Sequence, residues 1–391
     1  MTGSTVVHLT TVDMSLALLL LPQLVGIRDA GYDVIGVSAP GPYVETLESH
    51  GIPHVPLRRS TRAADLRADL ACAWEFAGLC HRLRPDIVHT HNPKPGVYGR
   101  IGARLAGVRA VVNTVHGLYA QPTDPLMKRA AVYSLERLAS SFSSAELVQN
   151  VEDLPVLRRL RIPVRKLHLL GNGVDLTRFD PPLDDVVRRR IRGRLGLSDE
   201  AVVIGLVGRL VREKGYGEVF AAARQLRAHL PQLHFVVVGP RDPAKPDAVS
   251  QTDIDRVARE ANVTFLGLRD DIEQLYAAMD IYVLASHREG FPRAAMEAAA
   301  MGLPIVATDI RGCRQVVEQG RTGLLVPVHD HTALAEAISR LATDPDLRTA
   351  MGTAARRKAV AEFDYRRQIA LTLQVYKDLL RGSRGSERLV R

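Results

Sequence analysis

Short runs of β-branched and other apolar residues alternate along the chain with longer stretches of helical periodicity. This alternation is typical of parallel βαβ units, whose strands are apolar on both faces because helices cover both sides of the sheet. In the first half the predicted strands are residues 6–9, 34–37, 87–89, 110–114 and 145–148, and the predicted helices are residues 14–30, 64–84, 95–106 and 125–140.

The same rhythm begins again in the second half. Its predicted strands are residues 202–207, 235–238, 263–265, 281–284, 305–307 and 322–325, and the chain is helical from Thr332 onward. Turn-forming and helix-breaking residues at 171–175, followed by Pro181-Pro182, predict a hinge. We therefore expect two doubly wound α/β domains, residues 1–175 and 176–362, and a last segment, residues 363–391, made of a helix and a basic tail.

Open α/β sheets bind ligands at the carboxyl ends of their strands, so motifs at strand-to-helix turns carry the candidate chemistry. The strongest is residues 288–297. Here Glu289 lies at the mouth of a helix, and Gly290, Phe291, Pro292 and Arg293 form the helix start, with Pro292 expected in the first helical turn. Backbone amides at such a start can bind an anion or a hydroxyl group.

Glu297 follows eight residues after Glu289. Two carboxylates placed in this way can each hold a pair of neighbouring hydroxyls, one on a sugar and one on a ribose. In the alternative, Glu289 is an acid favoured by the helix dipole and Glu297 is a surface residue. The Ala and Met neighbours of Glu297 argue against that alternative, because they predict a buried helix.

A second motif covers residues 205–215, in which a strand leads to Gly208, Arg209 and Lys214. Arginine offers a two-pronged donor to a diphosphate and lysine adds a point charge, so together they can stabilise a leaving phosphate. The spacing is neither a Walker loop nor a dinucleotide fingerprint. In the alternative, Arg209 and Lys214 have no role in binding, because arginine and lysine are common at such turns.

In the first half, His116 ends a strand, where it can face a substrate or simply cap a loop. Lys94 and Asn92 are expected to line an acceptor pocket, and Asp13 either caps a helix or contacts the acceptor. His89 and His91 share one strand face, but the sequence places no third metal ligand near them. The Asp-x-Asp triplets 253–255 and 344–346 do not follow apolar strands. We therefore predict no catalytic metal.

Composition narrows the class of protein. The chain of 391 residues is 46% hydrophobic and 24% charged, which excludes extended disorder, and 5% aromatic residues leave little for stacking on nucleic-acid bases. The formal charge of +9 is spread over both halves and fits phosphate-bearing ligands or an anionic surface. Three separated cysteines, no membrane-spanning run and no basic residue before Arg28 predict reduced thiols and a cytoplasmic location.

With these motifs in place, the chain resembles the retaining glycosyltransferases of family 4, which have the GT-B fold of two Rossmann-like domains facing across a cleft. Within that family, residues 10–16, 89–96, 113–117 and 307–314 are similar to bacterial capsule, exopolysaccharide and lipid-linked oligosaccharide transferases. The resemblance implies transfer of a sugar from a nucleoside diphosphate sugar, with UDP favoured over GDP, to a glycan or lipid-linked acceptor. It implies no cofactor and no metal.

The resemblance also implies residue roles. Arg209 and Lys214 would bind the donor diphosphate, Glu289 the transferred sugar and Glu297 the ribose. The amides of residues 290–293 would reach the sugar or the phosphate, His116 would lie near the reacting carbon, and the base would rest near residues 265–268, which include Leu266. The loop at residues 10–15 lacks the Gly-Gly pair of many members. The last helix would cross back to the first domain.

Two other functions remain open from the sequence: a nucleotide-sugar epimerase of the same architecture, and a nucleotide-sugar-binding scaffold without catalysis. The Glu289 and Glu297 spacing favours the transferase. A separate hypothesis places a basic face of the first domain on anionic lipid, giving peripheral contact with the inner face of the cell membrane. Its residues are Arg58, Arg59, Arg62, Arg67, Lys128 and Arg129.

Overall fold

The computed structural model describes residues 3–61, 65–91, 93–120, 124–181, 184–243 and 245–387. The chain forms two compact units, Met1–Asn172 with Tyr365–Arg391, and Gly173–Asp364. The chain thus leaves the first unit inside the breaker-rich segment 171–175 and returns to it at the last helix. Of the residues expected to mark the hinge and the basic face, Pro182 and Arg62 lie outside the described residues.

The described part of the first unit has a seven-stranded parallel sheet in the order β3-β2-β1-β4-β5-β6-β7. The strands are β1 (Ser4–Val12), β2 (Tyr32–Ala39), β3 (His54–Pro56), β4 (Ile87–Thr90), β5 (Ala110–Val115), β6 (Ala145–Val148) and β7 (Leu167–Leu169). Each strand expected in this half lies within an observed strand. The edge strands β3 and β7 were missed, because three residues are too few to show a period of two.

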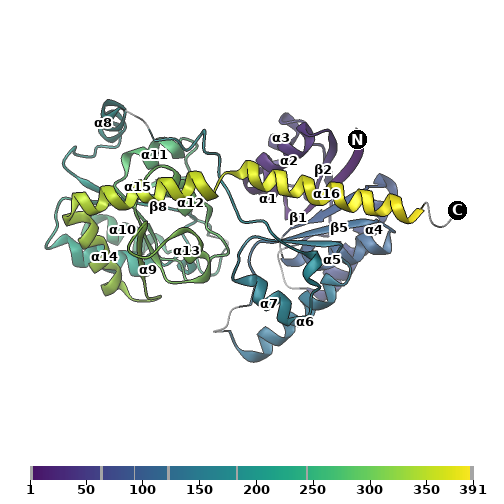
Figure 1. Ribbon diagram of the computed structural model, residues 1–391. Coiled ribbons are helices and arrows are strands. Elements are labelled where there is room, and N and C mark those ends of the chain that lie inside the picture. The colour runs from purple at the N-terminus through teal and green to yellow at the C-terminus, as the bar shows by residue number, and fades with distance from the viewer. Residues whose placement is uncertain are drawn as a thin grey trace. The chain divides into compact units, whose positions relative to one another are not determined.

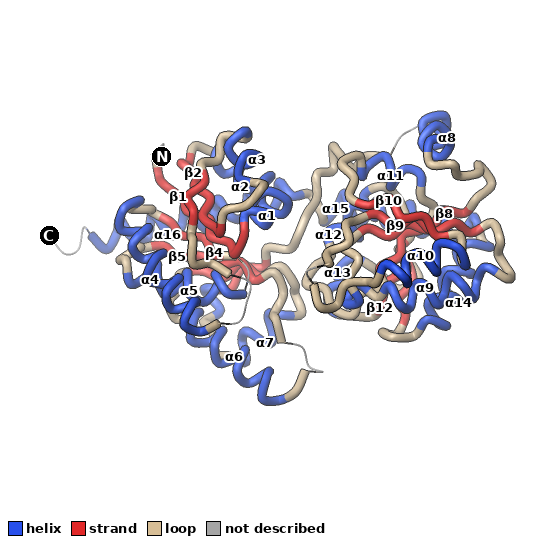
Figure 2. Tube along the Cα trace, turned by 180° about the vertical axis from the view of Figure 1, so that it is seen from behind, coloured by secondary structure: helices blue, strands red, loops and turns tan. Residues whose placement is uncertain are grey.

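Helices cover both faces of this sheet (Figures 1 and 2). Alternate residues of β1 show the division: Val6 packs with Leu24 and Tyr376 on one face, and Val7 packs with Phe76 on the other. The first face carries α1 (Asp13–Ser15), a π-helical turn (Leu16–Leu20), α2 (Leu21–Asp29), α3 (Val44–Ser49) and α16 (Tyr365–Glu387); the second carries α4 (Leu66–Leu83), α5 (Pro93–Leu105) and α6 (Leu126–Ser140), and α7 (Asp153–Arg159) follows β6.

Across its described residues the second unit has a six-stranded parallel sheet in the order β10-β9-β8-β11-β12-β13. The strands are β8 (Val202–Val207), β9 (Leu233–Val238), β10 (Val263–Gly267), β11 (Ile281–Leu284), β12 (Ile305–Thr308) and β13 (Gly323–Val326). One face is covered by α9 (Tyr216–Arg227), α10 (Gln251–Glu260) and α14 (His331–Thr343), and the other by α11 (Ile272–Ala278), α12 (Arg293–Ala300), α13 (Arg311–Val316) and α15 (Pro345–Glu362); α8 (Asp185–Arg194) precedes β8.

Strand order reverses once in each sheet, between β1 and β4 and between β8 and β11. The loops after neighbouring strands diverge at such a point and leave a crevice at the carboxyl edge of the sheet. The motifs singled out in the sequence follow β1, β4 and β5 in the first unit, and β8 and β11 in the second. The doubly wound α/β fold is therefore confirmed.

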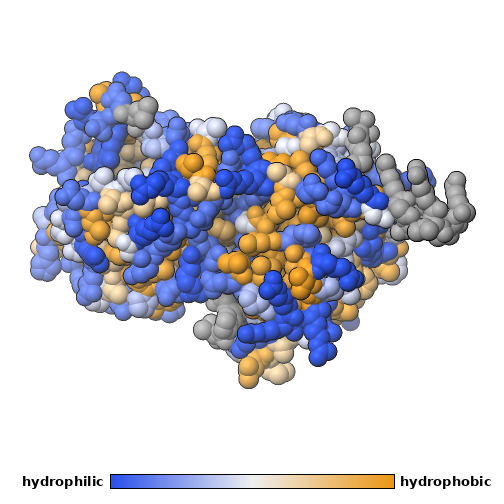
Figure 3. Space-filling model, in the orientation of Figure 1, coloured by the Kyte–Doolittle hydropathy of each residue, from blue (hydrophilic) through white to orange (hydrophobic). Residues whose placement is uncertain are grey.

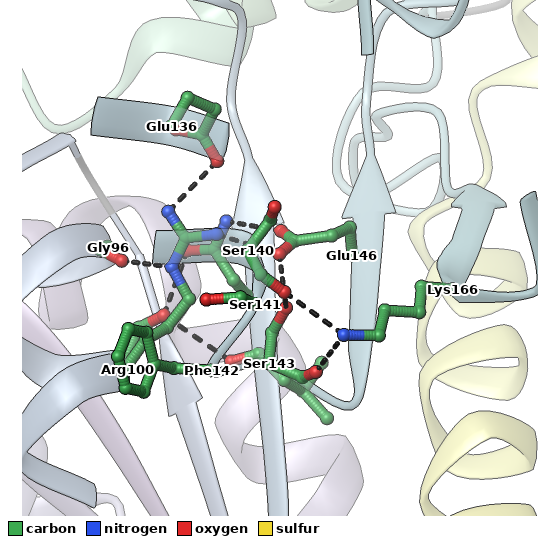
Figure 4. A network of polar contacts seen from close by, with 12 residues as sticks. Gly96, Arg100, Glu136, Ser140, Ser141, Phe142, Ser143, Glu146 and Lys166 are labelled. Atoms are coloured by element: carbon green, nitrogen blue, oxygen red, sulfur yellow. Dashed lines mark hydrogen bonds and ion pairs between the residues drawn. The ribbon is translucent and has the colours of Figure 1, made fainter. Parts of the chain in front are cut away.

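A buried ion-pair network ties α5 to β6 in the first unit (Figure 4). Arg100 Nη1 lies 2.7 Å from Glu146 Oε1, and both side chains are fully buried. Arg100 Nη2 lies 2.9 Å from the partly exposed Glu136, and Asn113 Nδ2 donates to Glu146 Oε2 at 2.8 Å. Burial raises the pKa of Glu146, and the charge of Arg100 opposes that rise.

Replacing Glu146 by Gln is expected to destabilise the protein by about 3–5 kcal/mol, because Arg100 would keep its charge in the core without a buried counter-charge. The measurement is the free energy of unfolding in urea. Glu136→Gln is the matched control, and its partly exposed carboxylate predicts a smaller loss, within about 1 kcal/mol. Equal losses from the two variants would contradict this account.

Candidate active site

The carboxyl ends of β8 and β11 bring a lysine and a glutamate into contact. Lys214 ends a 3₁₀ turn (Arg212–Lys214) after β8, and its Nζ lies 2.6 Å from Oε1 of Glu289, which follows β11. Ser286 Oγ donates to the same carboxylate oxygen at 2.7 Å. Because β8 and β11 are neighbours at the reversal of strand order, this pair lies where a doubly wound sheet binds its ligand.

Two glycines make this contact possible. Gly215 has φ +72°, and a Cβ there would lie 2.0 Å from the carbonyl oxygen of Ala285. A Cβ on Gly312 would lie 2.6 Å from the carbonyl oxygen of Glu289. Only residues without a side chain let these backbones approach so closely, and sequence reasoning assigned neither glycine a role.

Arg209 lies in the same loop and is held loosely. Its Nη1 is 3.9 Å from Asp242 Oδ2, and 47% of its side chain is exposed. The preceding Gly208 accepts a hydrogen bond from Tyr216 Oη at 3.0 Å through its carbonyl, which fixes the turn that carries Arg209. The guanidinium group is therefore placed on a defined backbone and still open to solvent.

Glu297 is buried in α12 and is not a surface residue. It accepts hydrogen bonds from Tyr276 Oη at 3.1 Å and from Arg293 Nε at 3.1 Å. Burial raises the pKa of Glu297, and the charge of Arg293 opposes that rise. The expectation of a buried carboxylate is confirmed, with Arg293 as its ionic partner.

The start of α12 differs from expectation by one residue. Pro292 lies before the helix in extended conformation, with ψ 112°, and its carbonyl already accepts from Met296 N, so the first helical residue is Arg293 and not the proline. Phe291 packs edge-on against Phe363, with ring centroids 5.9 Å apart. Gly290, just before it, is partly buried.

Leu266, the residue expected beside the base, lies in β10. It is half-buried against the side of the core that α11 and α12 cover.

A second polar cluster adjoins this loop and carries no signal in the sequence. Glu218 Oε1 accepts hydrogen bonds from His287 Nε2 and from His329 Nδ1, each at 2.9 Å. These three residues come from α9, the loop after β11 and the loop before α14, so only the fold gathers them. Their ligand atoms lie within 4.8 Å of one another and could hold a metal ion. The predicted absence of a catalytic metal remains a prediction.

In the first unit, the half-buried His116 lies at the end of a row of buried histidines, His8, His89 and His91. Its Nδ1 lies 3.2 Å from Gln149 Oε1, and its Nε2 lies 3.2 Å from His91 Nδ1. His91 Nε2 lies 3.0 Å from His8 Nδ1. Tyr376 Oη from α16 is 3.4 Å from His8 Nε2 and 2.6 Å from His89 Nδ1.

This row corrects the expectation that no third metal ligand lies near His89 and His91, because ring nitrogens of His8, His89 and His91 lie within 4.8 Å of one another and could hold a metal ion. His8 and His89 are partners in the register of β1 and β4, a proximity that sequence spacing cannot reveal. Burial lowers the pKa of His8 to about 3 and that of His116 to about 4, and it lowers the pKa values of His89 and His91 well below the usual range. The rings are therefore neutral at pH 7. Both ring nitrogens of His116 have protein partners, so this ring can bind a substrate only by exchanging one of them.

Asp13 and Lys94, the two other candidates in the first unit, bond to neighbouring segments of the chain. Asp13 is buried in the first turn of α1, and its carboxylate accepts from the amides of Met14 at 2.8 Å and Tyr43 at 2.7 Å. Lys94 Nζ pairs with Asp69 at 2.7 Å and donates to the carbonyl of Thr61 at 3.0 Å. Asn92, expected beside Lys94, lies outside the described residues.

The chain matches two family models, one in each unit. Residues 24–178 match the model described as "Glycosyltransferase Family 4", and residues 187–358 match that described as "Glycosyl transferases group 1". The chain is 32% identical over 324 residues to the UDP-Gal:alpha-D-GlcNAc-diphosphoundecaprenol alpha-1,3-galactosyltransferase of Escherichia coli, covering 82% of each chain. It is 26% identical to the capsular polysaccharide biosynthesis glycosyltransferase CapM of Staphylococcus aureus, covering 93% of this chain and 94% of CapM.

Solved structures share the fold at lower identity. The Anabaena protein Alr3699/HepE, solved in complex with UDP and glucose, superposes with a TM-score of 0.81 at 22% identity, covering 96% of this chain and 100% of that one. Sucrose-phosphate synthase from Thermosynechococcus elongatus gives 0.82 at 22% identity, covering 97% and 100%.

Two Rossmann-like units in tandem, each matched by a glycosyltransferase family model, define a glycosyltransferase of the GT-B class. The chain belongs to glycosyltransferase family 4. The resemblance drawn from the motifs is confirmed, and the epimerase and scaffold alternatives gain no support from these relatives.

Proposed function

We propose that this glycosyltransferase transfers a sugar from a nucleoside diphosphate sugar, with UDP favoured as the nucleotide, to a hydroxyl of a lipid-linked or glycan acceptor. The names of its relatives support the substrates, since the Escherichia coli enzyme uses UDP-Gal and a diphosphoundecaprenol-linked acceptor. The observation that carries the proposal is the contact between Lys214 and Glu289 at the strand-order reversal of the second sheet. Such an acceptor would place the enzyme at the cytoplasmic face of a membrane.

In this proposal the second unit binds the donor. Arg209 and Lys214 hold the diphosphate, Glu289 the transferred sugar and Glu297 the ribose. Gly208 and the backbone of residues 290–293 complete the phosphate and sugar contacts, and the base lies beside Leu266. The first unit contributes His116 near the reacting carbon. Asp13 and Lys94 shape the acceptor side indirectly, through the loops that they hold.

The reaction proposed is retaining and independent of metal. The acceptor oxygen forms a bond to the anomeric carbon on the same face from which the diphosphate oxygen departs, and the proton of the acceptor passes to a phosphate oxygen. Arg209 and Lys214 stabilise the charge that develops on the leaving diphosphate, the task that a divalent cation performs elsewhere. Glu289 and Ser286 keep Lys214 oriented before the donor arrives.

The test is release of nucleoside diphosphate from a panel of UDP- and GDP-sugars, with lipid-linked acceptors and a chelator present. Release from one donor is expected to survive the chelator and to collapse in Glu289→Ala, whereas the control Glu260→Ala, an exposed acid in the same unit, keeps full activity. NMR of the product reports the anomeric configuration. Loss of activity in chelator, or an inverted product, would refute the mechanism proposed here.

A further inference from the structure

Two histidines and a glutamate of the second unit converge from three separate elements. Glu218 lies in the first turn of α9, His287 in the loop after β11 and His329 in the loop before α14. Glu218 Oε1 lies 2.9 Å from His287 Nε2 and 2.9 Å from His329 Nδ1. The three ligand atoms lie within 4.8 Å of one another. Both rings therefore direct a nitrogen at the same carboxylate oxygen.

This spacing is close to that of ligands around a metal ion. Zinc binds imidazole nitrogen and carboxylate oxygen at about 2.0–2.2 Å, so the ligand atoms of a tetrahedral site lie about 3.3 Å apart. An increase of about half an ångström in each contact would open the space that such an ion occupies. The rings of His287 and His329 are tilted by 59° with centroids 4.0 Å apart, so they are not stacked and their nitrogens can face a shared centre.

The backbone holds these ligands in position before an ion arrives. The amide of His287 donates to the carbonyl of Glu213 at 2.9 Å, and Glu218 is carried on a regular helix. His329 has φ +65°, a left-handed conformation that glycine adopts freely and that a residue with a side chain rarely adopts. Backbone strain of this kind clusters at functional sites. At this position it brings an imidazole ring to Glu218, a contact that glycine could not make.

The ligand set selects the class of ion. Two imidazole nitrogens and one carboxylate oxygen suit Zn²⁺ and similar transition metals, whereas Mg²⁺ and Ca²⁺ bind mainly through oxygen. The exposed fraction of the side chain rises from 18% at Glu218 through 26% at His287 to 65% at His329, so the cluster opens to solvent on one side. The second unit presents a mainly hydrophilic surface in the view of Figure 3. Water can therefore complete the coordination.

We propose that Glu218, His287 and His329 bind one transition-metal ion, Zn²⁺ or a chemically similar dication, with a water molecule in the fourth position. The bound ion joins α9, the loop after β11 and the loop before α14. Because Glu289 follows His287 by two residues, the ion also holds the loop that carries Glu289. None of the three ligands binds the donor in the proposed function. The ion therefore stabilises the fold, and release of nucleoside diphosphate is expected to continue without it.

Zinc binding by the full chain tests this site. The protein is treated with chelator, exchanged into metal-free buffer and titrated with zinc chloride by calorimetry, and its zinc content is measured after dialysis. Wild type is expected to bind one equivalent at this cluster. His329→Gly removes a ligand and suits the left-handed backbone; it is expected to weaken this binding about 100-fold or more, since even an outer-shell partner contributes 10–100-fold. Glu218→Gln keeps an oxygen acceptor but removes the charge, and is expected to weaken binding as well.

Two control variants separate this cluster from other histidines. His331→Gln replaces an exposed ring two residues from His329 and is expected to leave zinc binding unchanged. His91→Gln disrupts the three histidines gathered in the first unit and is expected to leave the zinc equivalent of the second unit in place. Zinc that is lost in His91→Gln but retained in His329→Gly would lie in the first unit, and the proposal would be wrong. A wild-type protein that binds no zinc would show a hydrogen-bonded cluster only, and would also overturn it.

Thermal unfolding and spectroscopy give two further measurements. An ion that binds only the folded chain stabilises it, so zinc is expected to raise the unfolding temperature of wild type and not that of His329→Gly. An equal rise in both proteins would place the ion elsewhere. Circular dichroism without metal establishes that the variant is folded. Co²⁺ at this site is expected to show the strong visible absorption of a four-coordinate ion, and the weak absorption of a six-coordinate ion would contradict the geometry.

These measurements need neither donor nor acceptor. A protein that binds zinc at this cluster and transfers no sugar would refute only the proposed function. A protein that transfers sugar and binds no zinc would refute only the metal site.

Discussion

Between pH 6.5 and pH 5, the first unit is expected to lose about 2 kcal/mol of unfolding free energy for each histidine of its row that stays neutral in the folded state. His8, His89, His91 and His116 all have folded pKa values below 6.5, because burial disfavours the imidazolium ion. In the unfolded chain the same rings bind a proton near pH 6.5. Four such groups together reach the 5–15 kcal/mol that holds a typical domain folded.

The direction follows from proton binding. A base whose folded pKa is depressed binds its proton only after unfolding, so its contribution to stability is intact above about pH 6.5 and declines as the pH falls toward the folded value. The slope of unfolding free energy against pH gives the number of protons taken up, with about 1.4 kcal/mol per pH unit for each proton. Urea unfolding followed by circular dichroism from pH 7 to pH 5 measures that slope.

Single substitutions provide the control. His91→Gln is expected to lower the proton uptake by one, whatever it does to stability at pH 7, because it removes one titrating group. His81→Gln changes an exposed ring at the end of α4 and is expected to leave the slope unaltered. A wild-type stability that stays constant from pH 7 to pH 5 would show that the buried histidines do not carry the pH dependence described here.

Lys214→Ala is expected to lower turnover by about 10²–10³-fold, the usual cost of removing one preorganised donor from a developing negative charge. Arg209→Ala is expected to cost about 10²-fold or more for the same reason. Arg227→Ala, an exposed arginine in α9, serves as the control and is expected to retain wild-type turnover. The measurement is kcat/KM from release of nucleoside diphosphate.

The ion pair adds a sharper test. Because Lys214 Nζ and Glu289 Oε1 lie 2.6 Å apart, the two residues are expected to act as one unit. Lys214→Ala with Glu289→Ala should then be about as defective as the worse single variant. Costs that simply add would mean that the two side chains act independently and that their contact has no part in holding the donor.

The strands, the place of the candidate site and the burial of Glu297 could be predicted from residues that are close together in the sequence. Runs of Val and Ile between helical stretches predict parallel strands wherever the run is long enough, as at β8 and β11. Because functional loops in such sheets follow strand ends, the positions of Lys214 and Glu289 just after those strands placed the candidate site. The Ala and Met neighbours of Glu297 indicated its burial correctly. The three cysteines, expected to be reduced, are free and buried.

Other features depended on which strands and loops become neighbours. The histidine row exists because β1 and β4 pair with His8 opposite His89, although 81 residues separate them along the chain. Glu218 meets His287 and His329 for a similar reason, and Gly215 and Gly312 matter only because a distant backbone passes within contact distance. The engagement of Asp13 and Lys94 by neighbouring loops was equally hidden from the sequence.

The physical reason for this division is the range of each interaction. Periodicity and burial on one helix face depend on residues a few positions apart, so the sequence alone determined the two parallel sheets, the placing of Lys214 and Glu289 after strand ends, and the burial of Glu297 in its helix. Hydrogen bonds and charge pairs between elements depend on strand order and register. Only the tertiary structure therefore decided that three buried histidines and the half-buried His116 form one row, and that Glu218 meets His287 and His329.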